Sequence, residues 1–217
     1  MAPEYLLRPN AAFKLGVSAF NLGDFPRAAA AFSSVTTGEL AADALFWKGQ
    51  ALESQGGEQL LPARDAYLQY TVKAPAGGLA LDALLGAGRV ELLKKDYTAA
   101  KTHLQQALDQ GTVLGEKDPA LAERAKSVQP EAQYLLGQAA FEQKHYDDAL
   151  RLLAAVSLYN LEPWYSRSLL LMARAGAANN DPAAAVKTLQ LLRKTFPDSD
   201  AAKEIPKVAA EYQLTME

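Results

Sequence analysis

Apolar side chains recur along most of the chain at intervals of three and four residues, the spacing of an amphipathic helix. The stretch YLLGQAAFEQKHYDDALRLLAAV, residues 134–156, shows this pattern clearly. It contains Gly137, although glycine in a helix interior costs roughly 1 kcal/mol relative to alanine. No run of alternating apolar and polar residues between turn signals predicts a strand. The pattern therefore predicts an all-α protein in which some glycines serve packing rather than local helix preference.

The marks around Gly137 recur elsewhere in the chain. Counting from this glycine, an aromatic residue follows at +9, alanine at +12 and a large apolar residue at +16. The other copies are Gly16 with Phe25, Ala28 and Phe32; Gly49 with Ala63 and Tyr67 after two extra residues; Gly88 with Tyr97, Ala100 and Leu104; and Ala173 with Pro182, Ala185 and Leu189. Five copies of one pattern predict an internally repeated fold.

Each copy reads as a helix, a tight turn and a second helix. Asp24, Asp96 and Asp181 occupy the +8 position, where a helix N-cap acceptor is needed. Two antiparallel helices approach closely only where the crossing point carries little side chain. We therefore expect Gly137 and Ala149 to face each other, with the +16 residue filling the neighbouring gap.

These marks resemble the tetratricopeptide repeats, helix–turn–helix units of about 34 residues with the pattern W-x2-L-G-x2-Y, A-x3-F, P. The best matches are Leu15-Gly16 with Ala28-x3-Phe32, Leu136-Gly137 with Ala149-x3-Leu153, and Pro75 and Pro197 at the final proline. The repeats are degenerate. The small residues from which the copies are counted lie 33, 39, 49 and 36 residues apart, and the leading Trp of the pattern is missing. The resemblance implies an all-α, right-handed superhelical solenoid of about five hairpins with a C-terminal capping helix.

A single repeat domain is expected over residues 1–217. The expected hairpins span 10–36, 41–75, 79–110, 130–162 and 165–197, and the expected cap spans 198–214. The longest interval between repeats contains residues 109–130, whose Asp118-Pro119 step and Ala/Leu/Glu/Arg run predict additional helix rather than a flexible linker.

Composition and charge narrow the classes of partner. The 217 residues are 49% hydrophobic and 22% charged, with a formal net charge of −3, so no broad positive field favours nucleic acid. The longest strongly apolar run, residues 169–173, is far shorter than the ~20 residues of a membrane-spanning helix. The first residues, MAPEYLLRPN, contain no apolar signal-peptide core, but Met1-Ala2-Pro3 is also compatible with a chain cut from a longer protein.

Candidate chemistry is sparse. The chain has no cysteine and only His103 and His145, without metal-ligand spacing around either. Phosphate-binding, nucleophile-elbow and dinucleotide-binding motifs are missing from the sequence. We expect no catalytic, cofactor or metal site, and His145, at the +8 position, is expected to begin a helix.

The resemblance implies that the first helix of each hairpin lines a concave groove. Positions −3, +1 and +4 from the small residue share one helical face there. The protein-binding candidates are Phe13, Phe20, Phe46, Gln50, Arg89, Tyr134, Gln138, Phe141 and Arg174. The clamp by which some such repeats hold a C-terminal carboxylate needs Lys, Asn and Arg at inner positions, and this sequence does not supply the set. A second candidate surface, Tyr159 to Tyr165, is interpreted as ordinary packing.

The expected function is that of a non-catalytic scaffold that binds a protein or peptide partner in this groove. ADALFWKGQALESQGG, KAP and FPDSDAAKEIPKVAAEY are similar to segments of bacterial envelope repeat proteins, which favours the periplasm or cell envelope over the cytoplasm. The alternatives are a peptide-sensing regulatory module and a non-catalytic segment of a larger enzyme. The sequence sets no oligomeric state.

Overall fold

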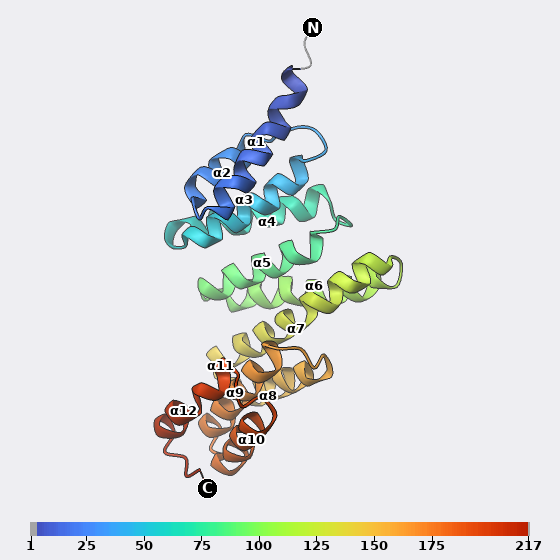
Figure 1. The fold of residues 1–217 in the computed structure, drawn as a ribbon. Coiled ribbons are helices and arrows are strands. Elements are labelled where there is room, and N and C mark those ends of the chain that lie inside the picture. Colours follow the sequence, from blue (N-terminus) through green and yellow to red (C-terminus); the bar gives the residue numbers. More distant parts are fainter. Residues whose placement is uncertain (1–3, 217) are drawn as a thin grey trace. The chain divides into compact units, whose positions relative to one another are not determined.

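The computed structural model describes residues 4–216, with side chains from Arg8 onward, and over that range it consists of helices joined by turns and loops, without a strand (Figure 1). Residues 1–3 and 217 of the expected repeat domain lie outside the described residues. No helix in the described range combines the length and apolar character that a membrane span requires. The chain forms two compact units, which meet in sequence between Arg124 and Ala125.

The first unit is a series of helices in which each packs against the next. Its helices are α1 (Glu4–Asn21), α2 (Phe25–Ser33), α3 (Ala41–Gln55), the short 3₁₀ helix η1 (Gly57–Gln59), α4 (Leu60–Lys73), α5 (Ala80–Leu93) and α6 (Tyr97–Gly115). Helices α1 and α2, α3 and α4, and α5 and α6 are the hairpins of this unit, corresponding to the first three sequence copies.

The second unit begins inside the long helix α7 (Pro119–Glu142). It continues through α8 (Tyr146–Ala154), the 3₁₀ helix η2 (Ala155–Leu158), α9 (Trp164–Ala178), α10 (Pro182–Thr195), α11 (Asp200–Lys203) and α12 (Ile205–Glu211). Helix α8 packs on α9, α9 on α10, and α11 on α9, so α11 and α12 follow the last hairpin.

Aspartate side chains begin three of the second helices. Asp24, Asp96 and Asp181 each accept a hydrogen bond from the backbone N–H three residues later, at 2.9–3.2 Å. This bond satisfies one of the free donors at a helix N-terminus. His145 has nearly the same backbone angles before α8 but makes no side-chain cap bond.

The small residues mark close helix contacts, and the +16 side chain is the partner that closes over each glycine. An ideal Cβ on Gly137 would lie 2.5 Å from Leu153 Cγ. A Cβ on Gly16 would lie 2.6 Å from Phe32, and one on Gly88 would lie 2.6 Å from Leu104. A real side chain at these positions would therefore overlap its neighbour, which explains glycine inside a helix.

The region between the third and fourth repeats is helical. Helix α6 continues to Gly115, and α7 starts at Pro119 after a short connection in which the Asp118 side chain accepts a bond from Ala120 N–H at 2.8 Å. A Cβ on Gly115 would lie 3.2 Å from the Ala122 backbone, so the two helix ends are in close contact. Arg124 pairs with Asp82 of α5 and joins the start of α7 to the first unit.

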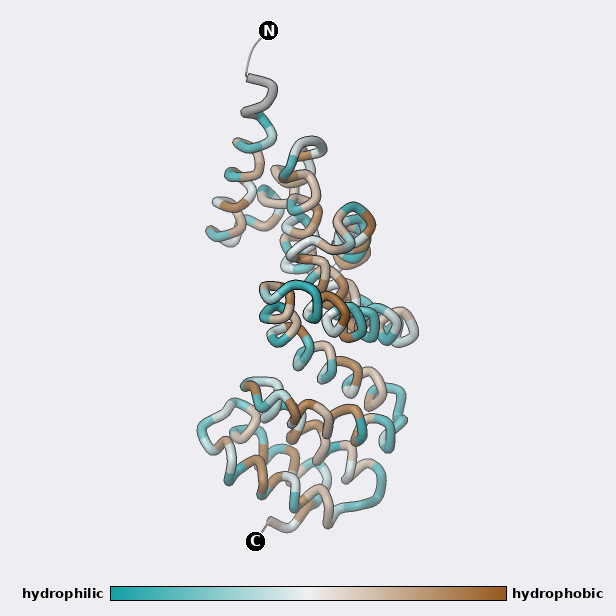
Figure 2. Tube along the Cα trace, turned by 90° about the vertical axis from the view of Figure 1, so that its right-hand side faces the viewer, coloured by the Kyte–Doolittle hydropathy of each residue, from teal (hydrophilic) through white to brown (hydrophobic). Residues whose placement is uncertain are grey.

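Each unit has its own apolar core. Phe32, Tyr67 and Tyr70 are almost completely buried in the first unit. In the second, Leu189 of α10 lies in one cluster with Ile205 and other apolar side chains of the C-terminal helices, which therefore cover the last hairpin. Figure 2 shows brown and teal segments alternating along the helices, as expected of helices with one apolar stripe.

Candidate functional site

The aromatic candidates of the first unit lie mainly in packing contacts. Phe13 meets Phe32 edge to face at 5.4 Å, and Phe20 meets Trp47 at 5.7 Å between ring centroids. Phe46 is only 3% exposed and lies against Tyr67 in the core. Phe46 therefore presents little surface to a partner, whereas Phe13 and Phe20 are half-buried.

The polar candidates of this unit differ in their partners. Arg89 donates from Nε to Glu53 Oε1 at 2.5 Å and from Nη2 to Glu53 Oε2 at 3.0 Å, and the Tyr67 hydroxyl donates to the same carboxylate at 2.6 Å. Burial, followed by the nearby Glu53 charge, raises the pKa of Tyr67. The Arg89 guanidinium thus already serves a network that ties α3, α4 and α5 together, while Gln50 is half-buried.

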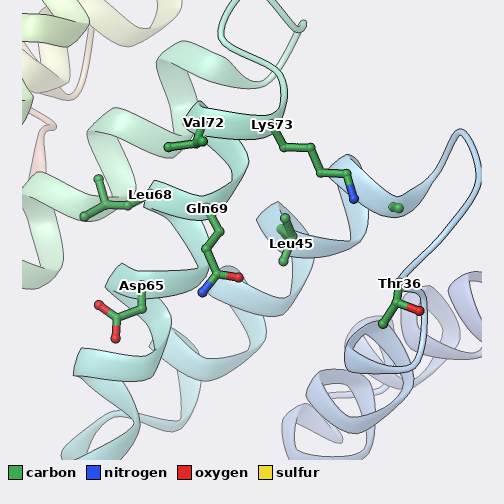
Figure 3. A pocket seen from close by; sticks show the side chains of 8 residues that line it. Thr36, Leu45, Asp65, Leu68, Gln69, Val72 and Lys73 are labelled. Carbon is green, nitrogen blue, oxygen red and sulfur yellow. The ribbon is translucent and has the colours of Figure 1, made fainter.

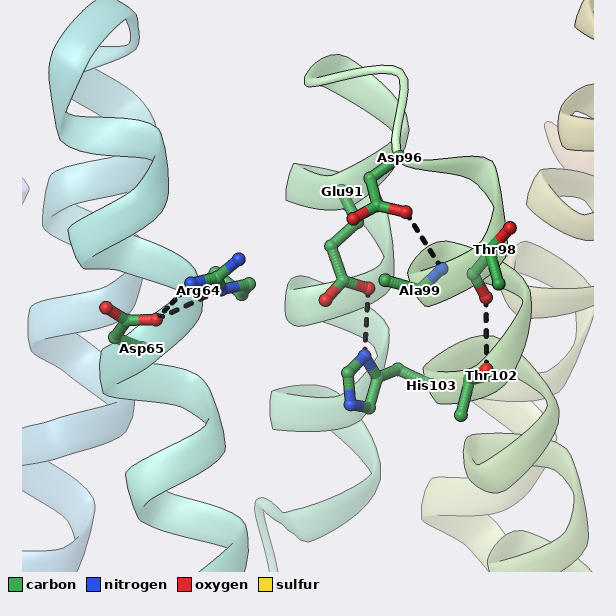
Figure 4. Close-up of polar contacts among 8 residues, drawn as sticks. All are labelled: Arg64, Asp65, Glu91, Asp96, Thr98, Ala99, Thr102 and His103. Carbon is green, nitrogen blue, oxygen red and sulfur yellow. Dashed lines mark hydrogen bonds and ion pairs between the residues drawn. The ribbon is translucent and has the colours of Figure 1, made fainter.

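A second polar pair was not anticipated from the sequence. Glu91, 3% exposed, lies 2.8 Å from Nδ1 of His103, joining α5 to α6 (Figure 4). A carboxylate three residues after Gly88, inside an apolar run, was the available signal. The described residues contain no group of three or more His, Asp or Glu side chains arranged for a metal ion. The pair links α5 to α6.

The second unit contains a pocket of about 210 Å³ formed by α7, α9 and α11. Tyr134 and Arg174, two of the predicted residues, both line it, together with Leu170 from another −3 position. The remaining lining residues are Arg167, Leu171, Asp200, Ala201 and Glu204. The structure thus brings candidates from two successive repeats to one small cavity.

Tyr134 forms an aromatic wall of this pocket. Its ring centroid lies 5.6 Å from that of Trp164, and Arg167 Cζ lies 5.1 Å from the ring centroid of the same tryptophan. Burial raises the pKa of Tyr134, an effect that the positive charges of Arg167 and Arg174 partly oppose. The Tyr134 phenol is therefore neutral at ordinary pH and able to donate a hydrogen bond.

Arg174 is incompletely paired. Its Nε is buried and has no hydrogen-bond partner among the described residues, and its Nη2 lies 3.8 Å from Glu211 Oε2. The two carboxylates that line the pocket lie closer to their partners than Arg174 lies to Glu211. Asp200 accepts a hydrogen bond from Lys203 at 2.7 Å, and Glu204 lies 3.4 Å from Lys207 Nζ. The hydrogen bond from Lys203 lowers the pKa of Asp200.

The other predicted residues of this unit lie outside the pocket lining. Phe141 is half-buried and its ring centroid lies 5.7 Å from that of Tyr146, and Gln138 is half-buried on the same helix. In the segment Tyr159 to Tyr165, Trp164 packs on Tyr134, and Tyr165 meets Phe196 at 5.1 Å.

A larger, more open pocket of about 600 Å³ lies in the first unit (Figure 3). Leu45 of α3 and Leu68 and Val72 of α4 supply apolar side chains, and Val72 is 84% exposed. Asp65 and Lys73 stand at its margins. Thr36 and Gln69 add polar side chains to its lining.

Several solved structures share the fold. MamA matches with a TM-score of 0.67 and 18% identity, covering 97% of this chain and 98% of that one. YrrB, described as a TPR protein with an unusual peptide-binding site, matches with a TM-score of 0.62 and 20% identity over 90% of each chain. A thermophilic TPR protein of Thermus thermophilus matches with a TM-score of 0.56 and 16% identity, covering 95% of this chain and all of that one. No curated protein sequence matches significantly.

The sequence itself also matches a family model. The tetratricopeptide repeat model aligns with residues 10–60, 118–163 and 134–200, together more than half of the chain. These ranges include the small residues that lie under the +16 side chains at Gly16 and Gly137. The chain therefore belongs to the tetratricopeptide repeat family.

Proposed function

We propose that this protein is a non-catalytic scaffold that binds an extended segment of a partner protein along the face formed by the first helices of its hairpins. Protein–protein interaction is the general role of the family. The observation that carries the proposal is the pocket between α7, α9 and α11, where Tyr134 and two arginines provide aromatic surface and donors.

The composition of this pocket suits recognition of a peptide. Large rigid aromatic side chains and arginine contribute most of the energy at protein interfaces. Leu170 and Ala201 add apolar surface beside the arginines. Apolar side chains of a peptide would therefore contact the leucine and alanine, and its polar groups would contact the arginines. The description of YrrB as a peptide-binding member of the same fold supports a peptide ligand.

The proposal is tested by selecting binders from a library of random-sequence displayed peptides with the whole chain as bait. Selected peptides are then titrated by fluorescence anisotropy against the wild-type chain and Tyr134→Ala. We expect this variant to bind about tenfold more weakly, because truncating an interface anchor costs more than about 1 kcal/mol. Circular dichroism verifies that the variant remains helical.

The matched control is Val72→Ala, in the open pocket of the first unit. Val72 is 84% exposed, so its truncation leaves the fold intact, and peptide affinity is expected to stay at the wild-type value. If Val72→Ala weakens binding while folded Tyr134→Ala does not, the partner lies at the pocket that Val72 of α4 lines and not at the Tyr134 pocket, and the proposal fails.

The proposal extends to an assembly in the bacterial envelope. It rests here on the similarity of ADALFWKGQALESQGG and FPDSDAAKEIPKVAAEY to envelope repeat proteins. Immunoblotting of fractionated source cells tests this part separately. A chain found only with cytoplasmic markers would contradict the envelope role and leave the peptide-binding proposal standing.

A further inference from the structure

We infer that the pocket between α7, α9 and α11 receives the side-chain carboxylate of an internal Asp or Glu in the bound segment. This inference rests on the proposed function and specifies the chemistry of its partner. Arg174 and Tyr134 supply the hydrogen-bond donors, Arg167 supplies additional positive charge, and Leu170, Leu171 and Ala201 form the apolar walls.

The residues that carry the donors line one pocket. Arg174 Nε is buried without a partner among the described residues, and burying an unsatisfied donor is unfavourable. Tyr134 and Arg167 line the same pocket as Arg174, and the positive charges of both arginines oppose the rise in the pKa of Tyr134 that burial causes. A carboxylate entering the pocket would accept from Arg174 and the phenol, which are strong donors to an anion.

The charges around the pocket favour an anion, although acidic residues are present. Asp200 and Glu204 line the cavity, but Lys203 and Lys207 lie next to them at 2.7 and 3.4 Å. Arg167 lies over the Trp164 ring and has no ion pair within 4.0 Å in the described part of the chain, although its charge helps to lower the pKa of Asp200. The nearest carboxylate to Arg174 is that of Glu211, at 3.8 Å, and Glu211 is 49% exposed. Each carboxylate of the lining therefore has a lysine partner, whereas neither arginine has an ion pair closer than 3.8 Å among the described residues.

The size and lining of the pocket suit the side chain of an internal residue of the partner better than the partner's C-terminus. Apolar walls from Leu170, Leu171 and Ala201 match the methylene stem of Asp or Glu. No side-chain amide lines the cavity to bind the main chain of a terminal residue as asparagine would. A volume of about 210 Å³ accommodates one such side chain while the rest of the segment lies outside.

The inference is tested with the peptides selected on the whole wild-type chain, synthesised with amidated C-termini. We expect the selected sequences to share an acidic residue at one internal position. Replacing it with the corresponding amide should weaken binding about tenfold, the effect of losing a charge-assisted bond. Arg174→Gln should weaken the acidic peptide equally and leave the affinity of the amide peptide nearly unchanged.

Two further variants separate a specific contact from general charge. Arg151→Gln changes a 70% exposed arginine on α8, away from the pocket lining, and is expected to bind like wild type. Glu211→Gln removes the carboxylate nearest Arg174 and is expected to tighten binding of the acidic peptide by roughly twofold to fivefold. Because Glu211→Gln gains affinity, loss of folding cannot imitate the expected result.

The outcomes distinguish this inference from the proposed function. Peptides that bind through Tyr134 without an acidic preference would leave the scaffold proposal standing and overturn the inference. Binding that requires a free C-terminal carboxylate, or an acidic preference that survives Arg174→Gln, would also overturn it. If no selected peptide binds the folded chain, both the inference and the proposed function fail.

Discussion

The glycines within helices are of two kinds, which differ in the space around their Cα atoms. A Cβ on Gly137 would lie 2.5 Å from Leu153 Cγ, a branched carbon near the backbone that has little freedom to move aside. A Cβ on Gly176 in α9 would meet nothing closer than 3.6 Å. Only the first glycine is therefore required by packing, although both lie in equally regular helices.

This difference predicts opposite responses to alanine. Gly137→Ala should destabilise the protein, because overpacking costs roughly 1–3 kcal/mol and helix preference returns at most about 1 kcal/mol. Gly176→Ala should raise the free energy of unfolding by up to about 1 kcal/mol. Urea denaturation of both variants measures the two effects. A gain in stability for Gly137→Ala would refute the close contact with Leu153.

Tyr67 makes stability depend on pH in the alkaline range. Its folded pKa is raised above the unfolded value of about 10, so its protonated phenol stabilises the fold fully below about pH 10 and progressively less above it. Tyr67→Phe should be about 1.5–3 kcal/mol less stable near pH 8, because the bond to Glu53 is lost. Between about pH 8 and 11, wild type should lose about 1.4 kcal/mol more than the variant. Parallel urea midpoints across this range would contradict the assignment.

At the scale of the helix, turns with similar backbone angles differ in how much their N-cap side chain stabilises the helix that follows. The backbone before α8 at His145 has φ −84° and ψ 69°, close to the −83° and 70° of Asp24. His145 makes no cap bond, whereas the aspartates do. His145→Asn should therefore stabilise the protein by about 0.5–1 kcal/mol without adding charge beside Asp147.

The matched control at this scale is Asp181→Ala. Removing the bond from Ala184 N–H to Asp181 should cost about 0.5–2 kcal/mol. Thermal melts of the two variants compare the gained and lost caps directly. An unchanged melting temperature in His145→Asn, together with a normal loss in Asp181→Ala, would show that backbone geometry alone does not make a useful cap.

The helices were largely predictable from sequence, and the pocket only in part. Periodicity and cap residues set the helix pairs, and the repeat position of Tyr134 and Arg174 placed both on the pocket-lining face. Arg167 lies six residues before Ala173, outside the −3, +1 and +4 positions, and α11 lies in the expected cap, 198–214, but carries no repeat marks, so neither was anticipated as pocket lining. Phe46 shares its repeat position with Tyr134 but is buried by the large neighbours Tyr67 and Tyr70. Burial depends on such neighbours, which the repeat register does not specify.

At the scale of the whole molecule, the chain divides into two compact units at Arg124 and Ala125, and single-domain behaviour stays a prediction. In repeat proteins, stability is approximately a sum of repeat and nearest-neighbour terms. A local change should therefore weaken its own hairpin and the adjacent one before it reaches distant helices.

Hydrogen exchange of Gly137→Ala tests this expectation. Opening free energies in α7 to α9 should fall by about 1 kcal/mol, while those in α1 to α4 should change by less than about 0.5 kcal/mol. An equal loss of protection in every helix would instead show that the two units unfold as one cooperative domain.

The central claim is that a partner segment lies on the first-helix face at the Tyr134 pocket. The most direct measurement follows the amide chemical shifts of the isotopically labelled whole chain during titration with a selected peptide. We predict that the largest changes fall on Tyr134, Arg167, Leu170 and Arg174 of α7 and α9 and on Ala201 of α11. Changes concentrated instead around Leu45, Leu68 and Val72 of the first unit, with the Tyr134 pocket unaffected, would contradict the claim.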